Sequence, residues 1–459
     1  MSGGASLPGV ATGGNPRVAA GRGTVIAWSL YELGATSIAM NMLSLHLPLD
    51  IASRVPRGSE KFSIAFGLSM AVVALLAPFL GRIADERGKR RFLVPFVLAG
   101  VAFTALVAAP GPVTRTLVFF ALANIAFQSA YVFYNALLPD ITDETTQGKV
   151  SGFGVAAGYL GSLTGMFLVL PFVSGGIRAR MPGFVVWICD WLSVAPVSTA
   201  EGAAFTRVNA YIPTAFFWLL AALPLLFLAR LPKPTPRVGP RGSAFADVVK
   251  TIRSLPKTPS ILWFLASNFL YIDVIHTIQI QMSTYSRFAV GLSDRQVQIL
   301  LFVATAIAIV GGLLYGLLCQ YVTIRTATLV ALANWVLVFA LALTIRSPRL
   351  FPIVGVLAGV GLGGIKVTSR LGLVALVPKE RMTEFFGFFT LAGEAASVLG
   401  PFIWALTLSR FPDQSPEGYR TALFVLFLVL LGSILVFLKV RFEPPVAEER
   451  VDADGDAAA

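Results

Sequence analysis

Twelve long apolar stretches divide this chain of 459 residues, and they restrict it to folds that sit in a lipid bilayer. Each stretch can cross a hydrocarbon core of about 30 Å as an α-helix. Hydrophobic residues make up 56% of the chain and charged residues 13%, whereas soluble domains have roughly 25% charged residues. We therefore expect an all-α membrane protein with twelve transmembrane helices, at 24–48, 61–81, 92–109, 116–138, 151–174, 208–229, 261–283, 297–319, 326–345, 352–377, 385–409 and 421–439.

The short segment 81–91 indicates the orientation of these helices. It lies between two apolar stretches and is rich in basic residues, namely Arg82, Arg87, Lys89, Arg90 and Arg91. A loop this basic stays on the cytoplasmic side of a membrane. With an even number of spans, both termini lie on that side, and the inner segments then hold more Lys and Arg than the outer ones. We expect a multi-pass protein of a bacterial inner (cell) membrane with both termini in the cytoplasm.

The longest inner loop, 230–260, is basic and proline-rich, and it divides the spans six and six. This is where two pseudo-symmetric six-helix halves would be joined. We expect a disordered cytoplasmic tail at 1–23, an N-terminal half at 24–229, a linker at 230–260, a C-terminal half at 261–439 and a second disordered tail at 440–459. An outer insertion, 175–207, contains Trp187 and Trp191, which we place at the membrane interface without assigning them a function.

Polar side chains inside the expected helices are costly, so their positions carry information. They recur in the first, fourth, seventh and tenth spans, a period that two repeats of two three-helix units would give. In the fourth span they share one helical stripe. Such a stripe either lines a cavity or forms a hydrogen-bonded seam between helices. The candidates for a substrate or proton pathway are Glu32, Asn124, Gln128, Tyr131, Asn135, Asp273, His276, Lys366, Arg370 and, in the eleventh span, Glu394.

The charged members of this set allow two interpretations. Lys366 and Arg370 would each cost about 2.5–3.5 kcal/mol at mid-bilayer, so something must offset that cost. One interpretation is structural ion pairing, for example of Lys366 with Glu394, which we favour for Glu394. The other is a carboxylate that gains and loses a proton, and for Glu32 and Asp273 we leave both interpretations open. His276 fits a hydrogen-bonded core residue better than a proton carrier.

Other patterns limit the chemistry. Glycines spaced four residues apart in the fifth, eighth and tenth spans predict close helix contacts. The chain has no glycine-rich phosphate loop, no His, Cys, Asp cluster with metal spacing and no catalytic triad, so we expect no enzyme activity, cofactor or metal. The net charge of +12 resides in loops, where it fits topology signals and anionic lipid headgroups rather than nucleic acid.

The basic loop also carries a motif. Its pattern resembles the loop between helices two and three of the major facilitator superfamily, and the resemblance implies the major facilitator fold and alternating access. It also implies a cytoplasmic gate, in which the superfamily's Asp locks near the start of the eleventh helix. The matching residues are Gly81, Asp85, Arg87, Gly88, Lys89 and Arg90.

Further stretches resemble the branch of that superfamily that contains the autophagy-related vacuolar amino-acid effluxer and its bacterial relatives. They are Trp28-x-x-Tyr31-Glu32, Tyr134-Asn135-Ala136-Leu137-Leu138-Pro139-Asp140, Ser151-Gly152-x-Gly154-x-x-x-Gly158-Tyr159, Tyr271-Ile272-Asp273, Ser369-Arg370 through Pro378, Phe385-Phe386-Gly387 and Leu399-Gly400-Pro401. The chain departs from this branch at Glu32, where relatives tend to have Asp, and at Val274, where they tend to have Gly. Lys366 and Glu394 also differ from the usual residues.

Together these features predict a secondary transporter, working as a symporter or antiporter. We expect a monomer that moves a small polar solute, with amino acids as the first substrate class and protons as a candidate coupling ion. Its expected partners are this solute and membrane lipid. The alternatives are a sugar-type or drug-type porter of the same fold, and a non-transporting receptor or scaffold. The polar stripe argues against a scaffold, because a scaffold has no need to bear its cost.

Overall fold

The computed structural model describes residues 21–142, 146–198, 205–229, 253, 255–377, 389, 392–393 and 395–442. For 81–87, 139 and 147–149 it describes the backbone alone. Both expected tails lie almost wholly outside the described residues, and so do most of the linker 230–260 and Glu394. In the part that is described, all regular structure is helical, which confirms the predicted all-α class.

Ten helices in the described part of the chain are long and apolar enough to cross a membrane. Each overlaps an expected span, so the protein is a multi-pass membrane protein. Eight of them lie within single long helices, one extends α12 to Val290, and one extends α10 at both ends to Arg207–Leu228. The helices are α3 Gly58–Arg87, α4 Lys89–Val107, α5 Val113–Ala136, α7 Gln147–Val173, α10 Tyr211–Leu223, α12 Pro259–Tyr285, α13 Asp294–Tyr321, α14 Ile324–Thr344, α15 Pro352–Leu376 and α18 Pro416–Phe437.

The two other expected spans also contain helix. The stretch expected at 24–48 is one continuous helical run, formed by α1 Arg22–Ile38, a π-helical segment η1 Ala39–Leu45 and α2 His46–Arg54. Polar residues such as Glu32 and Asn41 make it less apolar than the ten. The span expected at 385–409 is described mainly in its second part, as α17 Leu399–Leu408. The fold is thus consistent with twelve spans.

Short elements connect the long helices. They are α6 Leu138–Ile141, α8 Gly175–Arg178, α9 Gly183–Leu192, the 3-10 turns η2 Arg207–Ala210 and η4 Leu255–Lys257, and the π-helical segments η3 Pro224–Leu228 and η5 Ser286–Val290. The connection between α3 and α4 is the single residue Gly88, whose φ of 88° favours glycine. The two helices can therefore follow each other without a loop.

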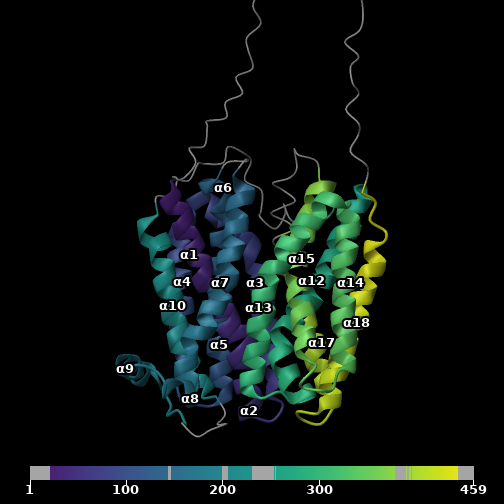
Figure 1. Cartoon of the computed structure of the whole chain (residues 1–459). Helices are drawn as coiled ribbons and strands as arrows, with labels where there is room; N and C mark the ends of the chain where they lie inside the picture. Colours follow the sequence, from purple (N-terminus) through teal and green to yellow (C-terminus); the bar gives the residue numbers. More distant parts are fainter. Residues whose placement is uncertain are drawn as a thin grey trace, which may run out of the picture. The chain divides into compact units, whose positions relative to one another are not determined.

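The helices form two compact units, one of residues 1–50 and 75–241 and the other of 51–74 and 242–459. In the first unit, α1 packs against α7 and α10, and α4 packs against α5 and α10. In the second unit, α12 packs against α17 and α18, and α14 packs against α15 and α18. In both units the first and third of the six spans each pack against the sixth (Figure 1). The repeated pattern agrees with two copies of one six-helix plan.

The helix α3 belongs to both units, because the boundary between them falls after Ala74. The part before the boundary is hydrogen-bonded within the second unit. Ser59 Oγ lies 2.5 Å from Tyr419 Oη, and Gln281 Nε2 donates to Ser63 Oγ at 2.7 Å. Pro78 lies within α3. Proline has no backbone N–H, so the carbonyl of Ala74, four residues earlier, lacks its usual helical donor.

Glycines bring pairs of helices into close contact in both units. A Cβ added to Gly161 of α7 would lie 2.0 Å from the carbonyl oxygen of Leu33 in α1. A Cβ on Gly363 of α15 would lie 2.2 Å from the backbone nitrogen of Gly312 in α13. The glycine faces expected from the sequence therefore lie at helix contacts, where backbones approach closely.

Candidate functional site

The first unit holds a buried carboxylate on α1. Glu32 is only 9% exposed, and the Tyr131 hydroxyl of α5 donates a hydrogen bond to its Oε1. Gly158 of α7 leaves room for it, because a Cβ there would lie 3.3 Å from Glu32 Oε1. The structure thus brings together two of the side chains that the sequence assigns to the pathway, from spans one and four. A hydrogen bond to an ionised acceptor is among the stronger kinds.

Aromatic rings surround this pair. Tyr134 stacks on Tyr31 with ring centroids 4.5 Å apart and on Trp28 at 4.7 Å. The indole N–H of Trp28 donates to the carbonyl oxygen of Tyr134 at 3.3 Å, which joins α1 to α5. Trp218 of α10 contacts Tyr31 edge-on. The sequence did not single out Trp218, although Trp28, Tyr31 and Tyr134 occur in the stretches that resemble known relatives.

The other predicted residues of the fourth span also lie on α5. Asn124 is buried there, and Gln128 and Asn135 are half-buried. This partial burial is compatible with both alternatives given for the stripe, which are the lining of a cavity and a hydrogen-bonded seam with a neighbouring helix.

The second unit holds a buried carboxylate on α12. Asp273 is 1% exposed, and its Oδ1 accepts a hydrogen bond of 2.9 Å from the backbone N–H of Gly400. Gly400 lies in the first turn of α17, where helical N–H groups have no intrahelical acceptor and favour negative charge. Among the described residues, no ion pair to Asp273 is found. A backbone donor has no sequence signature, so the pattern of side chains could not predict this partner.

A second polar cluster connects α12 to α15. The Tyr271 hydroxyl donates to Asn268 Oδ1 at 2.7 Å and lies 2.9 Å from Ser369 Oγ. All three side chains are buried. Nearby on α12, His276 Nδ1 lies 2.8 Å from Ser397 Oγ. This hydrogen bond agrees with the interpretation of His276 as a core residue.

Two cations lie on α15. Lys366 and Arg370 are one turn apart, and both side chains are exposed in the protein. The ion pair expected between Lys366 and Glu394 lies outside the described residues, because Glu394 is not described. Exposed cations on a membrane-spanning helix are costly against lipid.

The candidate cytoplasmic gate lies at the end of α3 and the start of α4. For Gly81, Asp85 and Arg87 the structure describes a helical backbone only. After the break at Gly88, the Lys89 ammonium donates at 2.5 Å to the carbonyl oxygen of Ala136 and to Asp140 Oδ2. Asp140 follows the end of α5 in α6, so Lys89 holds the start of α4 against this end of α5.

The neighbouring cation acts on a different helix end. The Arg90 guanidinium donates to the carbonyl oxygens of Leu226 and, at 3.2 Å, Ala229. These carbonyls belong to the end of the α10–η3 run, and cations are favourable near the C-terminal carbonyls of helices. Lys89 and Arg90 therefore fasten two helix ends within the first unit, in addition to any role they have in a gate.

Metal and disulfide chemistry have no visible site in the described ranges. There, no group of three or more His, Cys, Asp or Glu side chains could hold a metal ion. Cys189 and Cys319, both described, are free thiols.

Comparisons with known proteins agree with this architecture. The sequence model of the family described as "Vacuole effluxer Atg22 like" matches residues 61–448. The uncharacterized MFS-type transporter YxiO of Bacillus subtilis (strain 168) is 29% identical over 439 residues, covering 93% of this chain and 97% of its own length. Autophagy-related protein 22 of Yarrowia lipolytica is 22% identical over 327 residues, which cover 64% of this chain and 50% of that protein.

A solved structure supports the fold. The bacterial homologue of the human lysosomal transporter Spinster, in an inward-facing and unoccupied conformation, superposes with a TM-score of 0.68 at 14% identity, covering 92% of this chain and 98% of that one. The predicted major facilitator fold is thereby confirmed.

Proposed function

The chain belongs to the Atg22-like branch of the major facilitator superfamily transporters, and from that premise we propose that it moves a small polar solute by alternating access, coupled to protons. The observation that carries the proposal is the pair of buried carboxylates, Glu32 and Asp273. Each lies on the first long helix of its half, in a region that the sequence places inside the membrane. Acidic side chains at that depth are costly and are functional by default.

We assign proton exchange to these two carboxylates. Each accepts a hydrogen bond from an uncharged donor, the Tyr131 hydroxyl or the Gly400 N–H. Unlike a cation, an uncharged donor is not left as an uncompensated charge when the carboxylate gains a proton. Protonation is then compatible with the protein around it, as a transport cycle driven by a proton gradient requires.

For the substrate, we propose the class of amino acids. The exposed cations Lys366 and Arg370 suit a solute that carries a carboxylate, because charged donors form strong hydrogen bonds with carboxylate oxygens. The family description, which names a vacuole effluxer, is compatible with this class. A sugar carries no group of opposite charge for these cations, which makes a sugar-type porter the second choice.

We further propose that the protein is a monomer in the cell membrane of a bacterium, with both termini in the cytoplasm. The basic segment 81–91 supports this orientation, because such loops remain on the cytoplasmic side. The similarity to a bacterial transporter over nearly the whole chain supports the location.

The test uses purified protein in liposomes and a panel of amino acids, sugars and cationic drugs. We expect uptake of one or more amino acids that an inward proton gradient stimulates. Glu32→Gln and Asp273→Asn should abolish the stimulation, whereas exchange of labelled for unlabelled solute, which needs no net proton movement, should persist. Asp413→Asn, in an exposed outer loop, is the matched control and should behave like the parent protein.

Each component of the proposal can fail separately. Gradient-driven uptake that survives in both variants would refute the proton assignment. Uptake confined to sugars or drugs would refute the substrate class, and the absence of any uptake or exchange would refute transport of these solutes.

Orientation and oligomeric state have their own tests. If the orientation is as proposed, an impermeant maleimide should label Asp413→Cys in whole cells. If labelling occurs only after permeabilisation, the orientation is reversed. A mass above that of one chain, in light scattering of purified protein, would refute the monomer.

A further inference from the structure

The segment between α7 and α10 carries a short helix, α9, that the transport function does not use. The segment leaves α7 at its last residue, Val173, and returns to it, because the backbone N–H of Thr206 donates to the Val173 carbonyl oxygen at 2.9 Å. This end of α7 is opposite the end that lies near the α3–α4 connection, so it is the outer end. In Figure 1, α9 stands to the side of the other helices of its unit.

One face of α9 is apolar and exposed. Phe184 and Trp187 are 68% and 69% exposed, and Trp191 is 76% exposed, with Ile188 between them on the same stripe. The spacing i, i+3, i+4, i+7 places all four side chains on one side of the helix. Cys189, on another side, is fully buried. Two exposed tryptophans and a phenylalanine within ten residues form an apolar patch, and exposed patches of this kind mark interaction sites.

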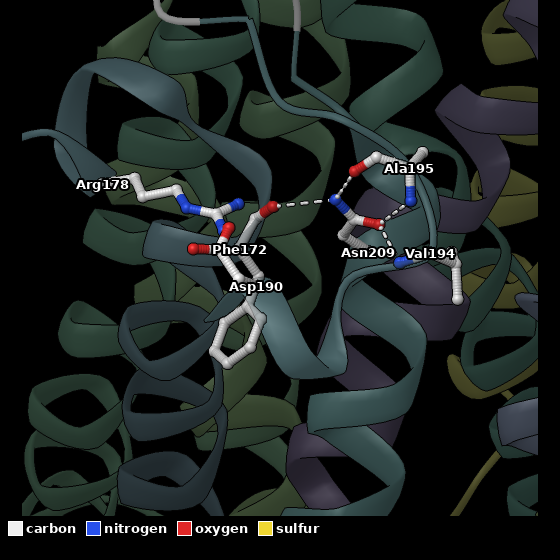
Figure 2. A network of polar contacts seen from close by, with 6 residues as sticks. All are labelled: Phe172, Arg178, Asp190, Val194, Ala195 and Asn209. Atoms are coloured by element: carbon white, nitrogen blue, oxygen red, sulfur yellow. Dashed lines mark hydrogen bonds and ion pairs between the residues drawn. The ribbon is translucent and has the colours of Figure 1, made fainter. Parts of the chain in front are cut away.

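The segment that follows α9 is held in place by hydrogen bonds between the Asn209 side chain and backbone groups. Asn209, which is 1% exposed, uses its whole amide. Its Oδ1 accepts from the N–H groups of Val194 and Ala195 at 2.9 and 3.0 Å, and its Nδ2 donates to the carbonyl oxygens of Ala195 and Phe172 at 2.8 and 3.3 Å (Figure 2). These bonds satisfy the full hydrogen-bonding capacity that an amide of this kind uses in a protein interior.

An ion pair completes the support. The Arg178 guanidinium binds the Asp190 carboxylate, which is the only charged group within α9 (Figure 2). Arg178 precedes the helix in α8. The single charge of α9 is thus paired to its own unit, and its apolar face carries no charge. Arg180, just before the helix, is exposed and adds a cation beside the stripe.

We propose that α9 lies in the plane of the membrane at its outer interface, with phospholipid as the partner of its apolar face. At about 1.5 Å per residue, ten residues are far too short to span a bilayer. Helices of this kind, apolar on one face and ending in Trp and Phe, settle at the boundary between headgroups and acyl chains. Tryptophan in particular concentrates at that level.

Similarity to the lipid-facing surface argues for lipid over a protein partner. In the same unit, Phe167 of α7 and Phe216 of α10 are 58% and 51% exposed, Phe167 toward the outer end of its helix and Phe216 near the middle. Exposed phenylalanines on membrane-spanning helices face acyl chains, and the apolar face of α9 has the same character. The exposed Arg180 matches the phosphate of a lipid headgroup.

The experiment measures tryptophan fluorescence of the full chain in liposomes whose lipids carry bromine either just below the headgroup or near the end of the acyl chain. We expect the shallow bromine to quench more than the deep one. The double variant Trp187→Phe/Trp191→Phe should lose more than half of the shallow quenching, because four of the five other tryptophans are buried away from bromine and the fifth, Trp263, is half-buried. Trp404→Phe, at a fully buried position, is the matched control and should leave the shallow quenching unchanged.

Three outcomes would overturn the proposal: equal quenching by both lipids, shallow quenching that the double variant retains, or efficient disulfide cross-linking of Trp187→Cys between two chains in the same liposomes. The last result would assign the face to a second copy of the protein. Because phenylalanine preserves the apolar character of the stripe, the variants should fold. A circular dichroism spectrum and a thermal unfolding curve check this directly.

Discussion

The two buried carboxylates occupy corresponding helices, but they are held in different ways. Glu32 accepts its hydrogen bond from a side chain, the Tyr131 hydroxyl, whereas Asp273 accepts from the backbone N–H of Gly400. A tyrosine can rotate away while both helices stay in place. A backbone N–H can leave only if α17 itself moves or bends. The comparison teaches that the Glu32–Tyr131 hydrogen bond can be broken locally, while the hydrogen bond of Asp273 to Gly400 is tied to the position of a helix.

The largest effect should come from Gly400, where the second carboxylate meets α17. In Gly400→Ala the N–H donor remains, but the new Cβ would lie 2.0 Å from Thr277 Oγ1. Overpacking of this kind costs roughly 1–3 kcal/mol, and we expect the upper end because the helix backbone must move. Thermal unfolding of the purified protein measures the loss.

Two variants calibrate that result. Gly432→Ala, in α18 with open space around it, should change stability little. Gly158→Ala beside Glu32 meets Thr36 Cγ2 at 3.1 Å and should cost about 1 kcal/mol, the low end of overpacking costs. Equal losses of stability for Gly158→Ala and Gly400→Ala would contradict the difference between the two sites, because they would mean that both carboxylates lie in equally rigid surroundings.

The next effect concerns the side-chain donor of the first carboxylate. Tyr131→Phe removes the hydroxyl that donates to Glu32 Oε1. Hydrogen bonds to charged groups contribute about 1.5–3 kcal/mol. Since about 1.4 kcal/mol is tenfold, we expect gradient-driven uptake to fall tenfold or more, with solute exchange affected less. Tyr321→Phe, at an exposed position on α13, serves as the control. Normal gradient-driven uptake in Tyr131→Phe would show that this donor has no part in coupling.

The smallest effect should come from the neutral cluster of the second unit. Ser369→Ala removes one hydrogen bond to the Tyr271 hydroxyl, which keeps its bond to Asn268. A neutral bond contributes about 1 kcal/mol net, so thermal stability should fall modestly and the ratio of gradient-driven uptake to exchange should not change. Ser409→Ala, on a more accessible hydroxyl, is the reference. A coupling defect in Ser369→Ala as large as that of Tyr131→Phe would extend the coupling machinery beyond the carboxylates.

The sequence predicts the spans well because burial in lipid requires long apolar runs. The expected span 326–345 corresponds to α14 at Ile324–Thr344, and 352–377 to α15 at Pro352–Leu376. The π-helical segments, such as Ala39–Leu45, could not be predicted, since a change in backbone hydrogen-bond register leaves the apolar pattern nearly unchanged. The continuation of the first span to Arg54 was missed for a related reason, because polar residues at its C-terminal end resemble a loop.

The candidate site was predictable in its members but not in its contacts. The cost of intramembrane charge singled out Glu32 and Asp273. Their partners are a tyrosine 99 residues away in one case and a backbone N–H in the other, and no local pattern encodes either. The hydrogen bonds of Lys89 and Arg90 could not be predicted, because the carbonyl oxygens that they bind are exposed by the folded helix ends and carry no side-chain signal.

The helix α3 has a mechanical consequence. It is one continuous helix whose residues are divided between the two compact units, so it links them covalently. A helix bends most easily where a backbone hydrogen bond is already absent. Pro78 has no N–H to donate to the carbonyl of Ala74, and Ala74 is the residue at the boundary between the units. The stiffness of α3 should therefore be lowest in the turn that contains Ala74 and Pro78.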